Sequence, residues 1–594
     1  MPGRARRGRG RLGHRAGQFE GIAAVTAPIR VTRHADSLND VARRAVRYPA
    51  AGRAPVGTLD LRSTRRSGVS TRFFDTPSGS NDTPSGRAGV PVAKTGSGEV
   101  AGSLDGRIAV WRGIPYAASV GGPNRFRTPQ PPLAWTGVRD CTDFGDVAPQ
   151  SPGFVPVDGS LRMGEDCLWL NVWAPADPSD ELRPVMVWLH GGAFCLGTAA
   201  QAIYDGKRLA ETGDVIVVGV NYRLGALGFL DLSSLGDEFV PNLGLHDQIA
   251  ALRWVRDNAA AFGGDPGNVT VFGESSGAGC VTALLTSPLS AGLFHRAIAQ
   301  SPPATTVFGP ERAALVAKRY LELLEITPDR AVELLTMPVE RIIAAAGTLL
   351  DEVPLREPGR LAAAPVVDGN LLPAYPSERF QQGRSHRVPL IIGTNRDEAS
   401  LFRLFRSPIM PVTPDAVNEM LRGVAAEHPG LSPERLAEIA AAYEATTARG
   451  ALTMSTDAAF RMPSHWVADA HSAHSPTWMY RFDHATPMLK AARVGAGHAT
   501  ELPYVFGNFG SFEYDPTFWL GGRKAAQDVS GRMMRRWLAF AGYGVPAAID
   551  GSKHWRPYDA AARPTLVIDA VDRMVDDPDR DRNSIWGDDV VGFY

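Results

Sequence analysis

The sequence is poor in cysteine and has no long apolar runs. Its four cysteines, Cys141, Cys167, Cys195 and Cys280, are too few for a disulfide scaffold and lack the paired spacing of a zinc site. We expect structural thiols, with a bridge between the first two left open. Because no run reaches about 18 apolar residues, no membrane span is expected. The N-terminal segment also lacks the apolar core of a secretory signal, which favours a cytoplasmic location.

Lysine is scarce as well, and the abundant arginine is unevenly spread. The stretch up to Arg66 holds fifteen Arg and four acidic residues, although the net charge of the whole chain is −1. Residues 1–91 are rich in Arg, Gly, Pro and Ser and show no sustained period, which predicts a disordered extension. Such a segment can bind nucleic acid through phosphates, but aromatic residues are almost absent from it. A solvated tail without a nucleic-acid partner is therefore favoured.

Residues 92–594 differ in composition and form the second predicted unit. Short β-rich apolar runs at 185–189, 215–220, 269–272 and 389–393 suit strands that are buried on both faces. Between the second and third runs, apolar residues recur every three or four positions, as on one face of a helix: Leu245, Ile249, Leu252, Val255, Ala259 and Phe262. This alternation predicts an α/β fold with a large, mostly parallel central sheet flanked by helices.

The run VTVFGESSGAG places Ser275 between Gly273 and Gly277, where a strand is expected to turn into a helix. A side chain at either glycine is expected to collide with the adjoining strand or helix. The pattern therefore predicts a sharp turn that holds the Ser275 hydroxyl at the carboxyl edge of the sheet, as in a nucleophile elbow. A Gly/Ser-rich loop without function is the alternative for the pentapeptide taken alone.

A second glycine-rich segment, HGGAF at His190–Phe194, follows the expected strand at 185–189. Backbone that is free of side chains can present N–H groups to a developing oxyanion, which is what an acyl-transfer enzyme needs. A simple turn that closes a βα unit is the alternative.

These residues resemble the type B carboxylesterase family of α/β-hydrolases, which includes cholinesterases and para-nitrobenzyl esterases. The resemblance extends from about Val100 to near the carboxyl terminus. Its motifs, in order, are RGIPYA, RFRTPQPP, GEDCLWLNVWAP, HGGAF, NYRLGALGFL, the long segment from Asn242 to Ala278, GTNRDEAS and HATELPYVFG. Their order and spacing together carry the resemblance and imply an α/β-hydrolase fold.

The resemblance implies a catalytic triad of Ser275, Glu398 and His498. Asp397 is the rival of Glu398, and we prefer Glu398 because it matches the family motif and because neighbours on an extended segment face opposite ways. Any of the thirteen histidines could otherwise be the base, including the His471 and His474 pair.

The resemblance also implies an oxyanion hole formed by the backbone N–H groups of Gly192, Ala193 and Ser276. Ser276 could compete as the nucleophile, but it is not centred between the two glycines. Phe194, together with Phe402 or Phe405, is the candidate lining of an apolar ester pocket.

The function implied is a serine hydrolase that cleaves small-molecule carboxylic esters through an acyl-enzyme. No cofactor and no metal are implied. The alternative is a non-catalytic adhesion or binding homologue on the same fold, as in neuroligin-like members of the family.

Overall fold

The computed structural model describes residues 89–153, 157–427, 432–511, 515–546 and 555–587. The predicted disordered extension lies, up to residue 88, outside the described residues. The first strand begins at Val92.

Most of the described strands form one sheet, and three form a small separate one. The strands are β1 (Val92–Thr95), β2 (Gly98–Ala101), β3 (Ser103–Asp105), β4 (Ile108–Pro115), β5 (Val138–Asp140), β6 (Trp169–Pro175), β7 (Arg183–Leu189), β8 (Ile216–Val220), β9 (Gly264–Glu274), β10 (Arg296–Gln300), β11 (Leu390–Asn395), β12 (Thr477–Phe482), β13 (Pro564–Ile568) and β14 (Arg573–Asp576). The small sheet has the order β1-β2-β5, and the large one has 11 strands in the order β14-β13-β12-β11-β10-β9-β7-β8-β6-β4-β3.

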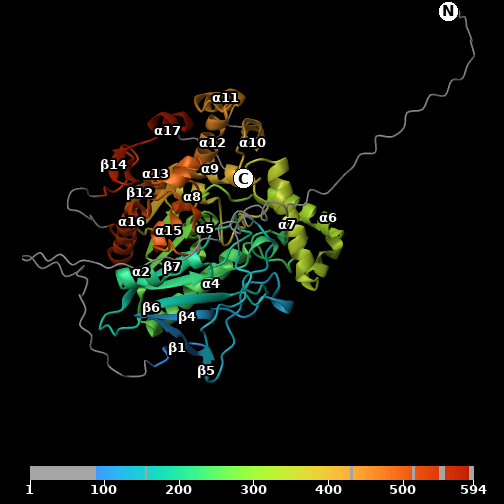
Figure 1. Ribbon diagram of the computed structural model, residues 1–594. Coiled ribbons are helices and arrows are strands. Elements are labelled where there is room, and N and C mark those ends of the chain that lie inside the picture. Colours follow the sequence, from blue (N-terminus) through green and yellow to red (C-terminus); the bar gives the residue numbers. More distant parts are fainter. Residues whose placement is uncertain (1–88, 154–156, 428–431, 512–514, 547–554, 588–594) are drawn as a thin grey trace, which may run out of the picture. The chain divides into compact units, whose positions relative to one another are not determined.

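Helices cover both faces of the large sheet (Figure 1). The α-helices are α2 (Lys207–Gly213), α3 (Gly225–Gly228), α4 (Leu243–Asn258), α5 (Ser276–Thr286), α6 (Pro310–Leu324), α7 (Val339–Arg356), α8 (Pro376–Gln381), α9 (Ala399–Phe405), α10 (Pro414–Glu427), α11 (Pro433–Ala442), α12 (Ala448–Thr456), α13 (Met462–Ser472), α14 (Pro487–Ala491), α15 (Leu502–Phe506), α16 (Arg523–Tyr543) and α17 (Arg580–Trp586). A π-helical turn, η8 (Asp457–Arg461), joins α12 to α13.

The centre of the large sheet is parallel, as predicted. The strands from β8 through β7, β9, β10, β11 and β12 to β13 pair in parallel, whereas β3, β4, β6 and β14 pair antiparallel at the two edges. Parallel strands end at the same edge of a sheet, so the loops after β7, β9 and β11 converge there. The four predicted apolar runs correspond to β7, β8, β9 and β11.

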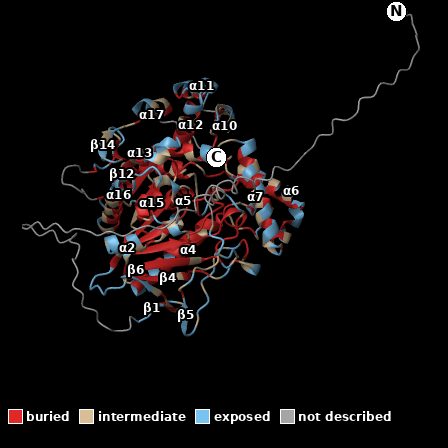
Figure 2. Ribbon diagram, viewed as in Figure 1, coloured by how far each residue is buried: buried red, intermediate tan, exposed pale blue. Residues whose placement is uncertain are grey.

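Alternate side chains of the central strands enter two different cores. In β7, Val185, Val187 and Leu189 pack into one core, while Met186 and Trp188 pack into the other. This follows from the period of two along a strand that is covered on both faces. Figure 2 shows the resulting buried interior surrounded by helices with exposed outer faces.

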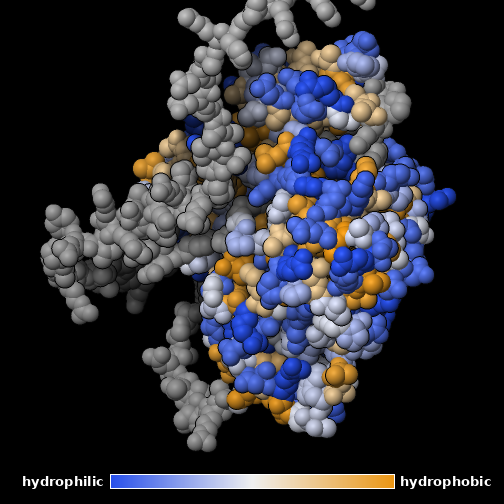
Figure 3. All heavy atoms as spheres, turned by 90° about the vertical axis from the view of Figure 1, so that its right-hand side faces the viewer, coloured by the Kyte–Doolittle hydropathy of each residue, from blue (hydrophilic) through white to orange (hydrophobic). Residues whose placement is uncertain are grey.

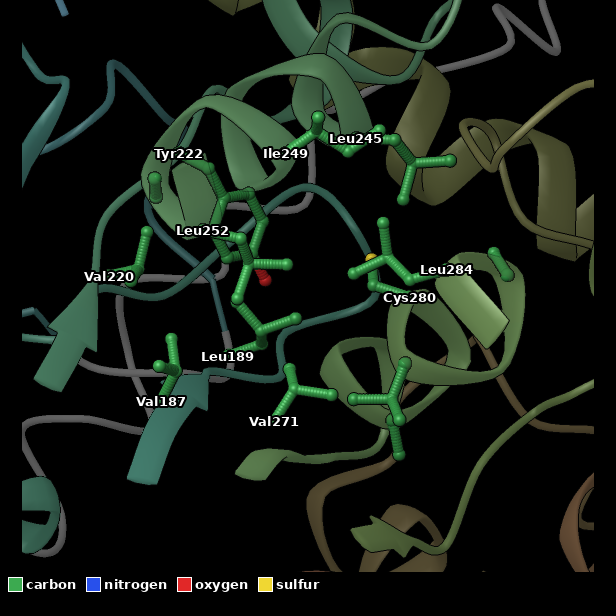
Figure 4. Packing of buried hydrophobic residues seen from close by; sticks show 14 of the residues in the cluster. Val187, Leu189, Val220, Tyr222, Leu245, Ile249, Leu252, Val271, Cys280 and Leu284 are labelled. Carbon is green, nitrogen blue, oxygen red and sulfur yellow. The ribbon is translucent and has the colours of Figure 1, made fainter. Parts of the chain in front are cut away.

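The core on one face of the sheet is closed by α4 and α5. Figure 4 shows the side chains that meet there, from β7, β8, the segment after β8, β9 and the two helices: Val187, Leu189, Val220, Tyr222, Leu245, Ile249, Leu252, Val271, Cys280 and Leu284. The predicted helical face is confirmed as far as Asn258. Its last two positions, Ala259 and Phe262, lie in a 3-10 turn that ends the helix at Gly263.

The outer helices α6 and α7 bury one stripe and expose the other. Val316, Ala317 and Tyr320 are buried, whereas Leu315 is exposed. Figure 3, which looks onto the side where these two helices lie, shows hydrophilic residues over most of the face with hydrophobic ones scattered among them.

Candidate active site

The turn between β9 and α5 places Ser275 where the sequence predicts it. Ser275 has φ 56° and ψ −128°, a backbone conformation that L residues rarely adopt. A Cβ on Gly273 would lie 2.7 Å from the backbone of Gly277, and a Cβ on Gly277 would lie 2.2 Å from the carbonyl oxygen of Leu189. The steric reason predicted for both glycines is confirmed.

The segment after β7 turns back toward this serine. Gly192 has φ 129° and Ala193 has φ 53°, so both lie in the left-handed region. Within the described residues, no hydrogen bond engages the backbone N–H of either residue. The segment is fixed from behind by His190, whose ring stacks on Tyr222 at 4.5 Å while the Tyr222 hydroxyl donates to the His190 carbonyl at 2.5 Å.

Ser276 is the first residue of α5, and its backbone N–H likewise has no acceptor among the described residues. The N-terminus of a helix carries partial positive charge, which favours an anion beside it. The Ser276 hydroxyl is buried and has no hydrogen-bond partner in the described part of the chain.

His498 is the histidine that meets Ser275. Its Nε2 lies 2.8 Å from the Ser275 Oγ, and its Nδ1 lies 2.7 Å from Oε2 of Glu398. The imidazole packs against Phe460, with ring centroids 4.6 Å apart, and against Phe402 at 5.1 Å. The three residues named as a triad are thus brought into one chain of contacts, although they lie far apart in the sequence.

Glu398 lies in the turn between β11 and α9, not on an extended segment. Of the two reasons for preferring it over Asp397, the one based on an extended segment is therefore wrong, even though Glu398 is the carboxylate that contacts His498. Asp397 instead accepts a hydrogen bond from the backbone N–H of Ala496 and pairs with Arg396 at 3.0 Å. Its side chain holds the loop that precedes His498.

The second oxygen of Glu398 is also occupied. Oε1 accepts hydrogen bonds from the Ser301 hydroxyl and from the backbone N–H of Asn395, each at 2.6 Å. With both oxygens engaged, the carboxylate cannot rotate away from the imidazole. Sequence reasoning missed Ser301, which follows β10 and carries no local signal.

Sequence reasoning also missed two buried acids, Glu274 and Glu501. Oε1 of Glu274 lies 3.2 Å from Nε2 of His498, and Glu501 accepts hydrogen bonds from Asn395 and Gln300. Burial raises the pKa of Glu274 to about 8 and raises that of Glu501 as well. Burial alone lowers the pKa of His498, but the Glu274 and Glu398 carboxylates outweigh it and raise that pKa to about 9.

The other candidates are placed away from this chain of contacts. Phe194 is buried against Phe229, and Phe405 is 58% exposed. His471 is buried and bonded to Ser385 and to the Val388 carbonyl. These contacts account for His471 structurally.

All four cysteines are buried and free. The bridge between Cys141 and Cys167 that the sequence left open is therefore not formed. Burial raises the pKa of the Cys141 thiol to about 11.

Within the described residues, no group of three or more His, Cys, Asp or Glu side chains is arranged to hold a metal ion. None of the helices in this part of the chain has the length and apolar character needed to cross a membrane.

Comparison with known proteins identifies the family of this chain. Residues 89–586 match the model of the carboxylesterase family. The para-nitrobenzyl esterase of Bacillus subtilis (strain 168) is 38% identical over 497 residues, covering 83% of this chain and 97% of the relative. The phenmedipham hydrolase of Pseudarthrobacter oxydans is 34% identical over 493 residues, covering 80% and 95%.

A solved PNB esterase structure aligns with a TM-score of 0.74 at 37% identity, covering 83% of this chain and 99% of that chain. The carboxylesterase family match, over residues 89–586, supports the same conclusion. The chain therefore belongs to the carboxylesterase family, with an α/β-hydrolase fold, and is a carboxylic ester hydrolase.

Proposed function

We propose that this enzyme hydrolyses carboxylic esters of small molecules through an acyl-enzyme formed on Ser275, with His498 as general base and Glu398 as its orienting acid. The observation that carries the proposal is the unbroken chain of contacts from Glu398 through His498 to Ser275, at 2.7 and 2.8 Å. A non-catalytic adhesion homologue has no need of this geometry.

In the first step, the Ser275 oxygen attacks the ester carbonyl carbon while Nε2 of His498 accepts the serine proton. The negative charge moves to the carbonyl oxygen, where the free N–H groups of Gly192, Ala193 and Ser276 can receive it. One such donor contributes about 3–4 kcal/mol to the transition state in other enzymes.

In the second step, the C–O bond to the alcohol breaks, and His498 returns its proton to the leaving alkoxide. Water then attacks the acyl-serine with His498 again accepting a proton, and the carboxylic acid leaves as Ser275 regains its hydrogen. Glu398 stabilises the imidazolium formed in each half of the reaction and holds Nδ1 in one tautomer.

The test compares wild-type enzyme with Ser275→Ala and with Ser276→Ala as its matched neighbour. With p-nitrophenyl acetate and butyrate, we expect Ser275→Ala to lose at least about 10⁴-fold in kcat. Ser276→Ala keeps its backbone N–H and should stay within about tenfold of wild type.

A fluorophosphonate probe should label wild type and Ser276→Ala but not Ser275→Ala. Equal rates for wild type and Ser275→Ala would remove Ser275 as the nucleophile. Loss of labelling in Ser276→Ala alone would transfer that role to Ser276.

A further inference from the structure

A cavity of about 550 Å³ borders the two segments that carry Glu398 and His498. Arg396 and Asp397, which precede Glu398, line it on one side, and Val494 and Gly495, which precede His498, line it on another. It lies beyond the carboxyl ends of β11 and β12 and is lined by residues of α12, α14 and α17. In open α/β sheets, ligands bind outside the carboxyl ends of the strands.

The lining of this cavity is strongly cationic, with seven Lys and Arg side chains and two Asp. Four of the arginines form its paired floor. Arg481 lies 2.9 Å from Asp579 and 2.8 Å from Asp483, Arg582 lies 2.8 Å from Asp457, and Arg461 also pairs with Asp457. Arg396, the fourth, pairs with Asp397. Four arginines therefore face four aspartates, and the floor is close to neutral.

The other three cations, Arg449, Lys490 and Arg493, are exposed and form no ion pair within the described residues. They come from α12, from α14 and from the residues just after α14. Like charges that gather at one cavity repel one another and concentrate a positive potential there, which favours an anion with several charges. Guanidinium groups match phosphate oxygens in a bidentate geometry.

We propose that this cavity binds a small molecule carrying a di- or triphosphate group, held by Arg449, Lys490 and Arg493 above the paired arginine floor. An anion of comparable charge complements three unpaired cations that line one cavity, and a polyphosphate supplies that charge. The volume leaves room for further groups beyond the phosphates. The site is separate from Ser275, and ligand binding there does not depend on the proposed hydrolysis.

Contacts from the cavity reach the turn that carries Glu398. The Arg461 guanidinium donates to the carbonyl oxygens of Arg396 at 2.8 Å and Asn395 at 3.1 Å. The backbone N–H of Asp397 donates to the Ala496 carbonyl at 2.8 Å. An anion that binds Arg461 or Arg396 therefore acts on the same backbone that positions Glu398 and His498.

The test measures the thermal unfolding midpoint of the full chain with sodium tripolyphosphate at low ionic strength, where exposed charges are least screened. We expect saturating ligand to raise the midpoint of wild type and of Ser275→Ala by about 5 °C. The triple variant Arg449→Ala, Lys490→Ala, Arg493→Ala should bind at least about tenfold more weakly by calorimetry and show almost no rise.

The matched control is Lys94→Ala, Arg253→Ala, Arg573→Ala, which removes the same charge at exposed positions outside the cavity. It should behave like wild type, and the Arg-rich N-terminal segment is common to all variants. Equal loss of binding in both triple variants, or an equal response to citrate, would overturn the proposal. A midpoint that tripolyphosphate leaves unchanged in wild type would do so as well.

A second readout is the hydrolysis of p-nitrophenyl acetate, a neutral ester. Saturating tripolyphosphate should change kcat/KM by about twofold or more in wild type and leave the cavity variant unchanged. An unchanged rate in wild type would overturn the link to the Glu398 turn. Binding by Ser275→Ala remains measurable even if the proposed mechanism fails.

Discussion

Two groups of charged side chains adjoin the turn between β11 and α9. The pKa of a buried carboxyl group is raised in one of them and lowered in the other. In the first, which we call the glutamate cluster, Glu274, Glu398 and Glu501 surround His498. Burial raises the pKa of Glu274 to about 8, and the opposing effect of the His498 imidazole is too weak to cancel it.

In the second, which we call the arginine cluster, Asp457 and Asp579 lie among Arg461, Arg481 and Arg582. Burial raises the pKa of Asp579, but the three guanidinium groups outweigh burial and hold that pKa well below its usual range. The comparison teaches that the number of cations, and not depth of burial, decides whether a buried acid keeps its proton. The first arrangement suits the proton transfer that we propose for His498, whereas the second fixes structure.

The largest expected effect tests the catalytic side of this comparison. In Glu398→Gln, the amide cannot stabilise the imidazolium, and kcat for p-nitrophenyl butyrate should fall by about 10⁴-fold. Asp397→Asn is the neighbouring control, because Asp397 contacts the Ala496 N–H and not His498. Its kcat should stay within about tenfold of wild type. Similar losses in both variants would mean that the turn, and not the Glu398 charge, is what matters.

The next effect tests the structural side. Asp579→Asn removes a buried negative charge from beside the buried Arg461 and the half-buried Arg481 and Arg582, so the free energy of unfolding at pH 7 should fall by about 3–5 kcal/mol. Urea unfolding measures this change. The exposed carboxylate of Asp177, paired with Arg107, provides the contrast, and Asp177→Asn should leave the unfolding midpoint where it is. A stable Asp579→Asn protein would contradict the role given to the arginine cluster.

The stabilisation by Asp579 should also depend on pH with a definite sign. Its pKa is lowered in the folded state, so the stabilisation is present above the ordinary pKa of about 4 and is lost as the pH falls. The gap in unfolding free energy between wild type and Asp579→Asn should therefore narrow from pH 7 to pH 3. If the difference in unfolding free energy widened over this range, the folded-state pKa of Asp579 would be raised and not lowered.

The smallest expected effect concerns the proton on His498. The Glu274 carboxylate raises the pKa of His498, so Glu274→Gln should move the acid limb of kcat/KM to lower pH by about one unit. Glu501→Gln should move it in the same direction but less, because Glu501 is the weakest of the carboxylates acting on that imidazole. A larger shift in Glu501→Gln than in Glu274→Gln would mean that Glu501 has the stronger effect on the pKa of His498.

The sequence predicts best what depends on neighbouring residues. Gly273 indicates the turn at Ser275 because a Cβ there would clash with Gly277, only four residues further on, whereas the clash at Gly277 is with Leu189, which is distant in the sequence. The runs that became β7 and β11 are recognisable because strands buried on both faces are apolar throughout.

Prediction was weaker where segments far apart in the chain meet. Glu398 was chosen from a family motif, and the physical reason offered failed because a turn follows β11 directly. Glu274 is adjacent to Ser275, yet its raised pKa depends on burial beside His498, which no local pattern reveals. The arginine cluster draws on residues from Asp457 to Arg582, and in the sequence these resemble ordinary surface charges.

The packing of His498 has one more consequence. Phe460 on η8 and Phe402 on α9 pack against the imidazole and restrict its movement. Under the proposed mechanism, Nε2 of His498 then serves the serine, the departing alcohol and the incoming water in succession from one fixed position. Any shift of those two helical segments therefore displaces the imidazole itself.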